Sequence, residues 1–390
     1  MWPRLVLMIA VAFAGSGVVP PPAPQGPSLQ AWLDAVNQHA PGAWDASAIT
    51  VWSWSSTDLE DVFETMRMQI EESGDKRPPM NRTLLAAAVL HADIAMLAAE
   101  PRRTADSGLL MTLARDGRVY GNQAVRYDWG FARRLIDAVL PDESSDRAVM
   151  LWYRAMAAYM ACNEQLSDSV PHLDRARRLF PRDAWVQFDT GAMYETFASP
   201  RIQAVVASMG PPANARAAGA TTRLAVPSVR EGLRMAQESY ARALALDPEF
   251  VEARVRLGRV LWMRGRQKEA IPELRKALGA SRDPIVNYDA ALALGGACES
   301  IDDFSCANDA YSRAARMYPL AQSPHLALSR LATRRGDVPA AQREMEQVLR
   351  LSPDAPDRGD PWWTYQQGSG RRVHALLASM HAAVRAVQQP

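Results

Sequence analysis

The chain has 390 residues, 48% of them hydrophobic, so it can bury a large core or form one elongated array. Its 44 Lys and Arg residues balance 43 Asp and Glu residues, which leaves a net charge of +1. Binding to nucleic-acid phosphates needs a basic excess on one face, so this balance argues against a nucleic-acid partner. Three cysteines are too few for a disulfide scaffold.

Residues 1–25 read as an export signal followed by a stiff linker. Arg4 gives a positive start, an apolar run extends from Leu5 to Ala14, and small residues follow. This order is typical of a secretory signal peptide, and the run is shorter than the ~20 residues that span a membrane. "VVPPPAPQGP" then predicts an extended spacer. We expect a periplasmic or secreted protein without a stable transmembrane span. An N-terminal anchor in the inner membrane is the alternative.

Residues 26–145 carry helical patterns without a regular repeat. "SLQAWLDAVNQH" starts at Ser28, a good N-cap, and "NRTLLAAAVLHADIAMLAAE" is strongly helical. We expect degenerate helical hairpins that stack onto the following part of the chain.

Further along, one helical motif recurs and ends each time in proline. "AQESYARALALDP" at 236–248 returns as "ANDAYSRAARMYP" at 307–319 and as "AQREMEQVLRLSP" at 341–353. On a helix, the Ala, the Tyr or Met four residues on, and the Ala or Val three further on share one face. Proline ends the helix because it has no N–H group.

A preceding helix in each unit carries a small residue where two helices would touch. These small residues and their partners on the second helices are Gly258 and Ala270, Gly295 and Ala307, and Ser329 and Ala341. Gly265 and Gly336 fall in the turns between the helices, and Asp302-Asp303 takes the equivalent place. Each unit is therefore predicted to be an antiparallel helix pair.

These units resemble tetratricopeptide repeats. Their terminal prolines recur at close to the period of about 34 residues of that family; they are Pro248, Pro284, Pro319 and Pro353. Good matches cover residues 251–286, 288–321 and 322–355, and a weaker one covers 150–183. The resemblance, to an exported bacterial type, implies an all-α, right-handed α-solenoid of stacked antiparallel helix pairs over residues 146–355.

One unit of this array is interrupted. Residues 184–197 read as a first helix, but the matching second helix begins only near Val229. We expect an insertion at about 198–228 with a short helix at Arg201–Met209. A degenerate extra repeat is the less favoured interpretation.

Residues 356–390 combine an aromatic loop with a final amphipathic helix at 371–387. An open solenoid leaves its last apolar face uncovered. We expect this helix to cap that face, with Trp362, Trp363 and Tyr365 wedged at its edge.

Cys298 and Cys306 each lie four residues from the turn at Asp302, on the two helices of one pair. Antiparallel packing can bring their Cβ atoms within the roughly 4 Å that a disulfide needs. A disulfide and two buried thiols are both open. Cys162 is expected in the core or the groove.

In the tetratricopeptide family, the first helices line a concave groove that binds a protein or peptide. Carrying those lining positions over gives a set of groove candidates, which are Arg154, Trp185, Phe188, Glu195, Arg259, Trp262, Glu299, Arg330 and Arg334. Aromatic and Arg side chains are enriched at binding hot spots. Val255 and Arg259 stand where some members clamp a C-terminal carboxylate with Lys or Asn, so that mode of binding is not carried over.

The sequence has no His-Glu-x-x-His, Gly-x-Ser-x-Gly, Cys-x-x-Cys or phosphate-binding glycine motif. We therefore expect no enzymatic activity, no cofactor and no metal. The favoured function is an exported scaffold or adaptor that binds a protein or peptide in its groove. The alternative is a cell-wall accessory protein that binds glycan through the C-terminal aromatic cluster.

Overall fold

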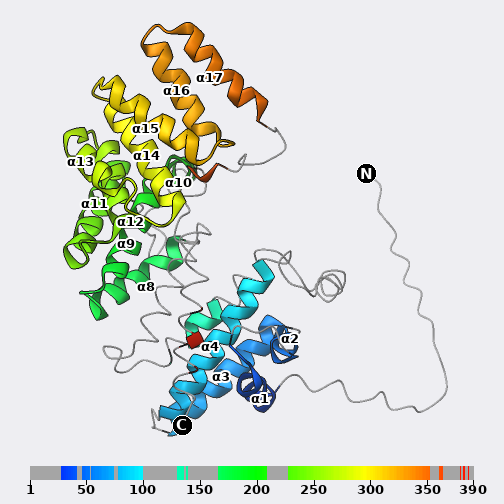
Figure 1. The fold of residues 1–390 in the computed structure, drawn as a ribbon. Helices are drawn as coiled ribbons and strands as arrows, with labels where there is room; N and C mark the ends of the chain where they lie inside the picture. The colour runs from blue at the N-terminus through cyan, green and yellow to red at the C-terminus, as the bar shows by residue number, and fades with distance from the viewer. Residues whose placement is uncertain are drawn as a thin grey trace, which may run out of the picture.

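The computed structural model describes residues 28–41, 46–52, 54–73, 78–99, 130–135, 138, 166–208, 227–351, 360–362, 378, 381, 382 and 385. Every regular element in these ranges is helical, so the predicted all-α class is confirmed. Figure 1 shows a smaller N-terminal group of helices and a longer row of helix pairs. The predicted leader at 1–25 lies outside the described residues.

The N-terminal group contains α1 (Leu29–Gln38), α2 (Ala46–Trp52), α3 (Ser56–Ser73) and α4 (Pro78–Ala99). Its centre is Trp32 of α1, which is fully buried and donates its Nε1–H to Nε2 of His91 in α4 at 3.3 Å. The end of α1 is fixed as well, because Nε2 of His39 lies 2.8 Å from Oδ2 of Asp93 in α4. Within the described part of the chain, no helix has the length and apolar character to cross a membrane.

The row of pairs contains α8 (Leu166–Leu179), α9 (Ala184–Phe197), α11 (Val229–Leu246), α12 (Val251–Met263), α13 (Gln267–Ala277), α14 (Pro284–Glu299), α15 (Phe304–Met317), α16 (Gln322–Arg334) and α17 (Val338–Arg350). Four pairs stack in sequence, and they are α9–α11, α12–α13, α14–α15 and α16–α17, with α8 against α9. The predicted stacking of consecutive helix pairs is confirmed.

Small residues allow the helices of each pair to approach closely. A Cβ atom added at Gly295 would lie 2.3 Å from Cε1 of Tyr311, and one at Gly258 would lie 2.5 Å from Cγ of Leu274. In the last pair, Oγ of Ser329 donates to the carbonyl oxygen of Ala341 at 2.9 Å. At Gly258 and Gly295, the partner side chains Leu274 and Tyr311 therefore fill space that a Cβ atom would block.

The turns and helix starts follow the sequence pattern. Gly265 and Gly336 have φ of 77° and 75°, and Asp302 holds the equivalent turn position with φ of 59°. Most first turns are capped by a preceding Asp or Ser side chain, as Asp283 does for α14. The start of α16, like those of α12 and α13, has no such cap; its N-cap residue is Ala321, which has no side-chain acceptor.

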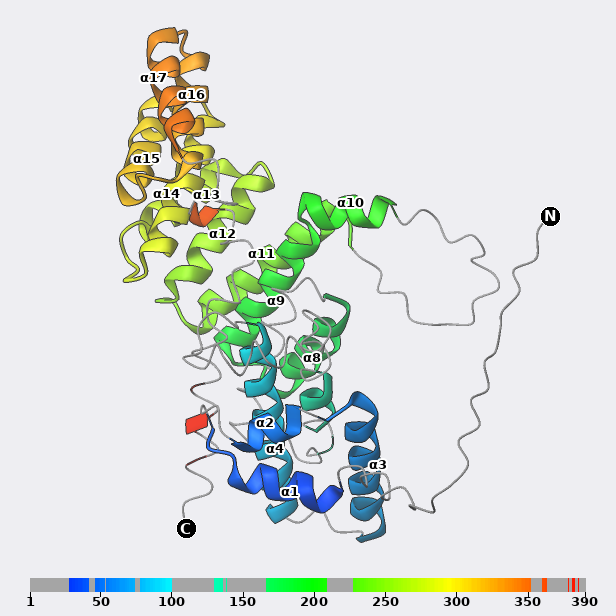
Figure 2. The ribbon, with the colours of Figure 1, turned by 90° about the vertical axis from the view of Figure 1, so that its right-hand side faces the viewer.

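The structure pairs α9 directly with α11 across the interruption. Gly191 of α9 faces Tyr240 of α11, where an added Cβ would lie 2.6 Å from Cε1 of the tyrosine. Between these helices in sequence is α10 (Pro200–Ser208), which starts one residue before the predicted short helix. Figure 2, turned by 90°, shows α10 projecting from the row.

After residue 362, the structure describes only residues 378, 381, 382 and 385, all of them helical. Nε2 of His381, a helical residue, lies 2.7 Å from Oδ1 of Asp93 in α4, and Figure 1 shows this turn beside the N-terminal group. At the other end of the row, Leu349 of α17 is 77% exposed. Most of the predicted capping helix at 371–387 lies outside the described residues, so the cap stays a prediction.

Candidate partner-binding site

The site lies on the surface shared by the first helices α12, α14 and α16, which we call the first-helix face. A pocket of about 200 Å³ opens there, and its lining residues are Trp262, Leu292, Tyr311, Ser323, Leu326, Ala327, Arg330 and Trp362. Pockets for whole small molecules are usually about 300–1,000 Å³. This one therefore suits one or two side chains of a larger partner.

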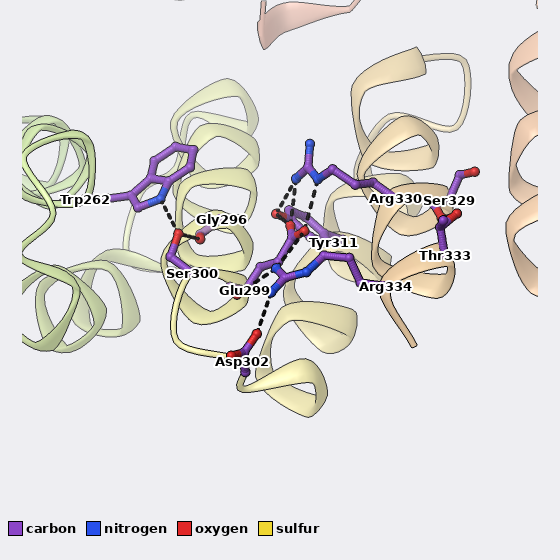
Figure 3. A network of polar contacts seen from close by, with 10 residues as sticks. All are labelled: Trp262, Gly296, Glu299, Ser300, Asp302, Tyr311, Ser329, Arg330, Thr333 and Arg334. Atoms are coloured by element: carbon purple, nitrogen blue, oxygen red, sulfur yellow. Dashed lines mark hydrogen bonds and ion pairs between the residues drawn. The ribbon is translucent and has the colours of Figure 1, made fainter. Parts of the chain in front are cut away.

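Trp262 forms a fixed wall of the pocket. Its indole packs against α14 at Gly296, where an added Cβ would lie 2.3 Å from Cζ2 of the ring. The indole Nε1–H donates to Oγ of Ser300 at 3.1 Å, and that hydroxyl donates to the carbonyl of Gly296 at 2.7 Å (Figure 3). Glycine at 296 and serine at 300 together set the ring's position.

Glu299 fixes two arginines at the opposite rim. This buried carboxylate accepts from Nε and Nη2 of Arg330 at 3.0 and 2.7 Å and from the Tyr311 hydroxyl at 2.8 Å (Figure 3). Arg334 bonds both Glu299 and Asp302. Burial alone would raise the pKa of Glu299, but these hydrogen bonds outweigh it and hold the pKa below its usual value. The Arg330 side chain is 59% exposed, so it presents a positioned cation at the pocket.

The chain's own residues 360–362 lie on the first-helix face. Asp360 is fully buried and accepts from the Tyr288 hydroxyl and from the Ser323 backbone N–H, both at 2.7 Å. Its carboxylate thus supplies the cap that Ala321 cannot give to α16, where a negative charge also favours the helix dipole. Burial, followed by the charge of Asp360, raises the pKa of Tyr288.

Trp362, two residues after Asp360, contacts Arg259 and also lines the pocket. The guanidinium carbon of Arg259 lies 4.9 Å from the centre of the Trp362 ring. Such a contact contributes about 1–2 kcal/mol when it is shielded from water. One face of the ring therefore meets a buried cation, while the residue also lines the pocket.

Arg259 belongs to a buried cluster of four charged residues, and the other three are Glu195, Arg256 and Asp289. Glu195 accepts from Nη1 of Arg256 at 3.0 Å and from the Tyr240 hydroxyl at 2.7 Å, and its Oε1 lies 3.4 Å from Nη1 of Arg259. Burial would raise the pKa of Glu195, but Arg256 and Arg259 outweigh burial and lower it. Burial raises the pKa of the neighbouring Asp289 to about 6 despite the attraction of both arginines. Two cations and two carboxylates thus compensate one another inside the array.

The structure brings together part of the predicted groove set. Trp262 and Arg330 line the pocket, Glu299 lies beneath its rim, and Arg334 binds beside it. Arg154 lies outside the described residues. The remaining predicted residues require correction.

Phe188, Glu195 and Arg259 are buried rather than open to a partner, with 0%, 7% and 3% exposure. The ring of Phe188 stacks 5.0 Å from that of Phe250 inside the core. Trp185 is half-buried, with its ring centre 4.4 Å from that of the same Phe250. The family's lining positions identify the side of a helix, but neighbouring helices decide how deep each residue lies.

Sequence reasoning missed Tyr288, Leu326 and Asp360 as site residues. Asp360 carried a weak signal, since α16 begins without a capping side chain and "GDPWW" follows the array. Trp362 was predicted at the edge of the C-terminal helix, and the structure places it on the first-helix face instead. Trp363 and Tyr365 lie outside the described residues.

The structure joins Cys298 and Cys306 by a disulfide, with their Cα atoms 5.8 Å apart. The carboxylate of Asp303 lies nearby and accepts from the Cys306 backbone N–H at 3.1 Å, so it caps α15. The two sulfur atoms are bonded to each other, so Cys298 and Cys306 form a covalent link between α14 and α15.

Comparison with known proteins finds a match to one family model over part of this array. No curated protein matches the chain. Among the solved structures that resemble it is MamA from Desulfovibrio magneticus RS-1, with 19% identity, 54% of this chain and 99% of that chain covered, and a TM-score of 0.40. PilF from Pseudomonas aeruginosa has 13% identity, with 60% of this chain and 90% of that chain covered and a TM-score of 0.40. YrrB has 15% identity, with 53% of this chain and 88% of that chain covered and a TM-score of 0.37. Residues 230–284, which include α12 and α13, match the family model described as tetratricopeptide repeat, so the row of helix pairs contains a recognisable tetratricopeptide-repeat segment.

Proposed function

We propose that this protein is an exported, non-catalytic adaptor that binds an extended segment of a protein partner on its first-helix face. Tetratricopeptide repeats generally mediate contacts between proteins and typically carry no catalysis, and residues 230–284 match that repeat. The balanced charge of the chain argues against a nucleic-acid partner.

One observation carries this proposal, namely the pocket between Trp262 and Arg330. Its apolar wall consists of Trp262, Leu292 and Leu326, while the charge of Arg330 stands at the rim. A partly apolar pocket with one fixed cation, too small for a whole cofactor, suits an anchoring side chain from a protein. Residues 360–362 lie beside it, so the face already accommodates a peptide segment.

Export is proposed from the sequence of residues 1–25 alone. Its positive start, short apolar run and small residues are typical of a cleaved secretory signal. A periplasmic or secreted location follows, with an anchor in the inner membrane as the alternative. Cell fractionation, together with the N-terminal sequence of the mature protein, distinguishes these locations.

The test is partner capture by in-cell cross-linking with a matched pair of variants. Leu326→Ser with Arg330→Gln removes an apolar wall and the rim cation, both from exposed side chains of α16. Leu349→Ser with Arg350→Gln makes the same changes on exposed side chains of α17, away from the pocket. We expect the first variant to lose a specific partner and the control to keep it. Equal capture by both would refute the pocket assignment.

Among the described residues, no observation favours the glycan-binding alternative, and Trp363 and Tyr365 lie outside them. A sugar ring stacks on an exposed aromatic face, but Trp362 is half-buried and has the guanidinium of Arg259 over its ring.

A further inference from the structure

We propose that residues 360–362 are a resident ligand of the first-helix face, and that the partner displaces them with a segment of the same pattern. That pattern is an acidic residue followed two positions later by an aromatic residue. The inference rests on the proposed function and adds what the partner segment must carry.

The acidic position is recognised by groups that belong to the array. The Tyr288 hydroxyl of α14 and the Ser323 N–H at the start of α16 both donate to Asp360 at 2.7 Å. The α16 terminus has no acceptor of its own, because Ala321 occupies its N-cap. Any carboxylate brought to this point from another chain would satisfy the same two donors.

The aromatic position is also prepared by the array. Arg259 is held over the Trp362 ring by Glu195, whose Oε1 lies 3.4 Å from its guanidinium. On the pocket side, the ring leaves a space of about 200 Å³ that is lined by Leu292 and Leu326. The resident segment therefore uses the cation while leaving an apolar space that a partner side chain could fill.

The resident segment is held through Asp360, the buried Pro361 and Trp362. Asp360 accepts three hydrogen bonds, one of them from the N–H of Trp362 itself, and Trp362 adds its ring contact and some apolar packing. A short tether gives such a segment an effective concentration in about the millimolar range. A free segment with only the same contacts competes poorly, whereas one that also fills the pocket gains an advantage.

The experiment uses a fluorescein-labelled peptide of residues 354–366, DAPDRGDPWWTYQ, and the full-length chain. Its receptor is the Asp360→Ala/Trp362→Ala double variant, from which the resident contacts have been removed. We expect this variant to bind the peptide at least tenfold more tightly than the wild-type chain does, by fluorescence anisotropy. A peptide carrying the same two alanine substitutions should not bind, and the surface variant Leu349→Ala should behave like wild type.

Adding Tyr288→Phe to the double variant should weaken the binding of the peptide, because one hydrogen-bond donor to its carboxylate is lost. Circular dichroism shows whether the double variant is folded. An independent measurement needs only the wild-type chain: hydrogen exchange with and without about 1 mM unlabelled peptide. Displacement should speed exchange in residues 355–366 while the start of α16 stays protected by the incoming carboxylate.

Peptide binding to the folded double variant, or displacement in the wild-type chain, supports the inference, and the absence of both overturns it. These outcomes are separate from the test of the proposed function. A chain that loses its partner through Leu326→Ser and Arg330→Gln, yet never binds the peptide, would keep the function and refute the resident-ligand inference.

Discussion

Gly295 shows how a single residue sets the distance between two helices. Tyr311 crosses directly over it, and the tyrosine hydroxyl then reaches Glu299, which anchors the rim arginines. The absence of a side chain at 295 therefore serves both the core and the site. A larger residue there must push Tyr311 away from both.

Gly295→Ala should accordingly destabilise the protein and disturb the rim. The new Cβ would lie 2.3 Å from Cε1 of Tyr311, and overpacking of this kind typically costs about 1–3 kcal/mol. Urea unfolding followed by circular dichroism measures the change. The control is Gly130→Ala, since a Cβ at that helical glycine meets nothing within 4 Å. Equal stability of the two variants would contradict this description of the helix contact.

Asp289 should make stability depend on pH in the opposite direction from an ordinary paired carboxylate. Burial raises its pKa from 3.8 to about 6, so the folded protein keeps a proton there that the unfolded chain releases. The free energy of unfolding should therefore fall by up to about 3 kcal/mol as pH rises from about 4 through 6. Glu195 acts in the opposite direction and only at the acidic end of this window, because its lowered pKa removes stability as pH falls below 4.5.

The check is urea unfolding at several pH values between 4 and 7 for wild type and Asp289→Asn. The variant cannot titrate at 289, so its stability should lose this decline across the window. Asp309→Asn changes an exposed residue of the same type and serves as the control. A wild-type decline that persists unchanged in Asp289→Asn would remove Asp289 as its source.

At the scale of helices, the disulfide closes the turn between α14 and α15. Cys298 and Cys306 are separated by eight positions, and closing such a loop stabilises a fold by about 2–3 kcal/mol in the chain-entropy model. Replacing both by Ala should lower the free energy of unfolding by up to that amount under non-reducing conditions. Treatment of the wild-type protein with reductant should produce a similar loss, to which the double Ala variant is insensitive.

Thiol counting gives an independent reading of the same link. The chain has three cysteines, so the denatured, unreduced protein should show one reactive thiol and the reduced protein three. Three reactive thiols without reductant would contradict the disulfide.

Local sequence predicted those helices and turns whose determinants lie within one repeat. Gly258 and Gly295 mark helix contacts, and Gly265, Asp302 and Gly336 mark turns, because each acts on a neighbour a few residues or one helix away. Long-range contacts left no such trace. Asp360 is 72 positions from Tyr288, and nothing in a local pattern specifies which distant hydroxyl a carboxylate will meet.

Depth within the array was equally hard to predict. Arg259 and Trp262 are three positions apart on α12, yet one is 3% exposed while the other lines the pocket. The difference arises from the neighbours: Arg259 meets Glu195 of α9 and Trp362, whereas Trp262 rests on Gly296 of α14. A repeat pattern assigns both to the same side, so only the assembled helices separate the buried charge from the binding surface.

At the scale of the molecule, described residues that follow α17 contact both groups of helices. Asp360 and Trp362 lie on the first-helix face, and His381 contacts Asp93 of α4. Asp93 of α4 lies within hydrogen-bond distance of both His39 and His381. The described residues of the C-terminal segment therefore contact the first-helix face at one point and α4 at another.

His381→Ala should release the C-terminal helix from α4 while leaving the array intact. Removing one partner of a buried polar pair costs about 1–2 kcal/mol, which corresponds to roughly tenfold faster exchange in a locally opening segment. Hydrogen exchange should therefore accelerate in residues 378–385 and remain unchanged in α12 to α15. The matched control is His325→Ala, which removes another His–carboxylate pair, that of Nδ1 with Glu344 at 2.7 Å, inside the last repeat. Its effect should stay within α16 and α17.

If His381→Ala leaves the exchange of residues 378–385 unchanged, the contact with Asp93 does not hold that segment. If it speeds exchange at the start of α16 as well, the anchor at α4 also supports the position of Asp360, since that carboxylate caps α16.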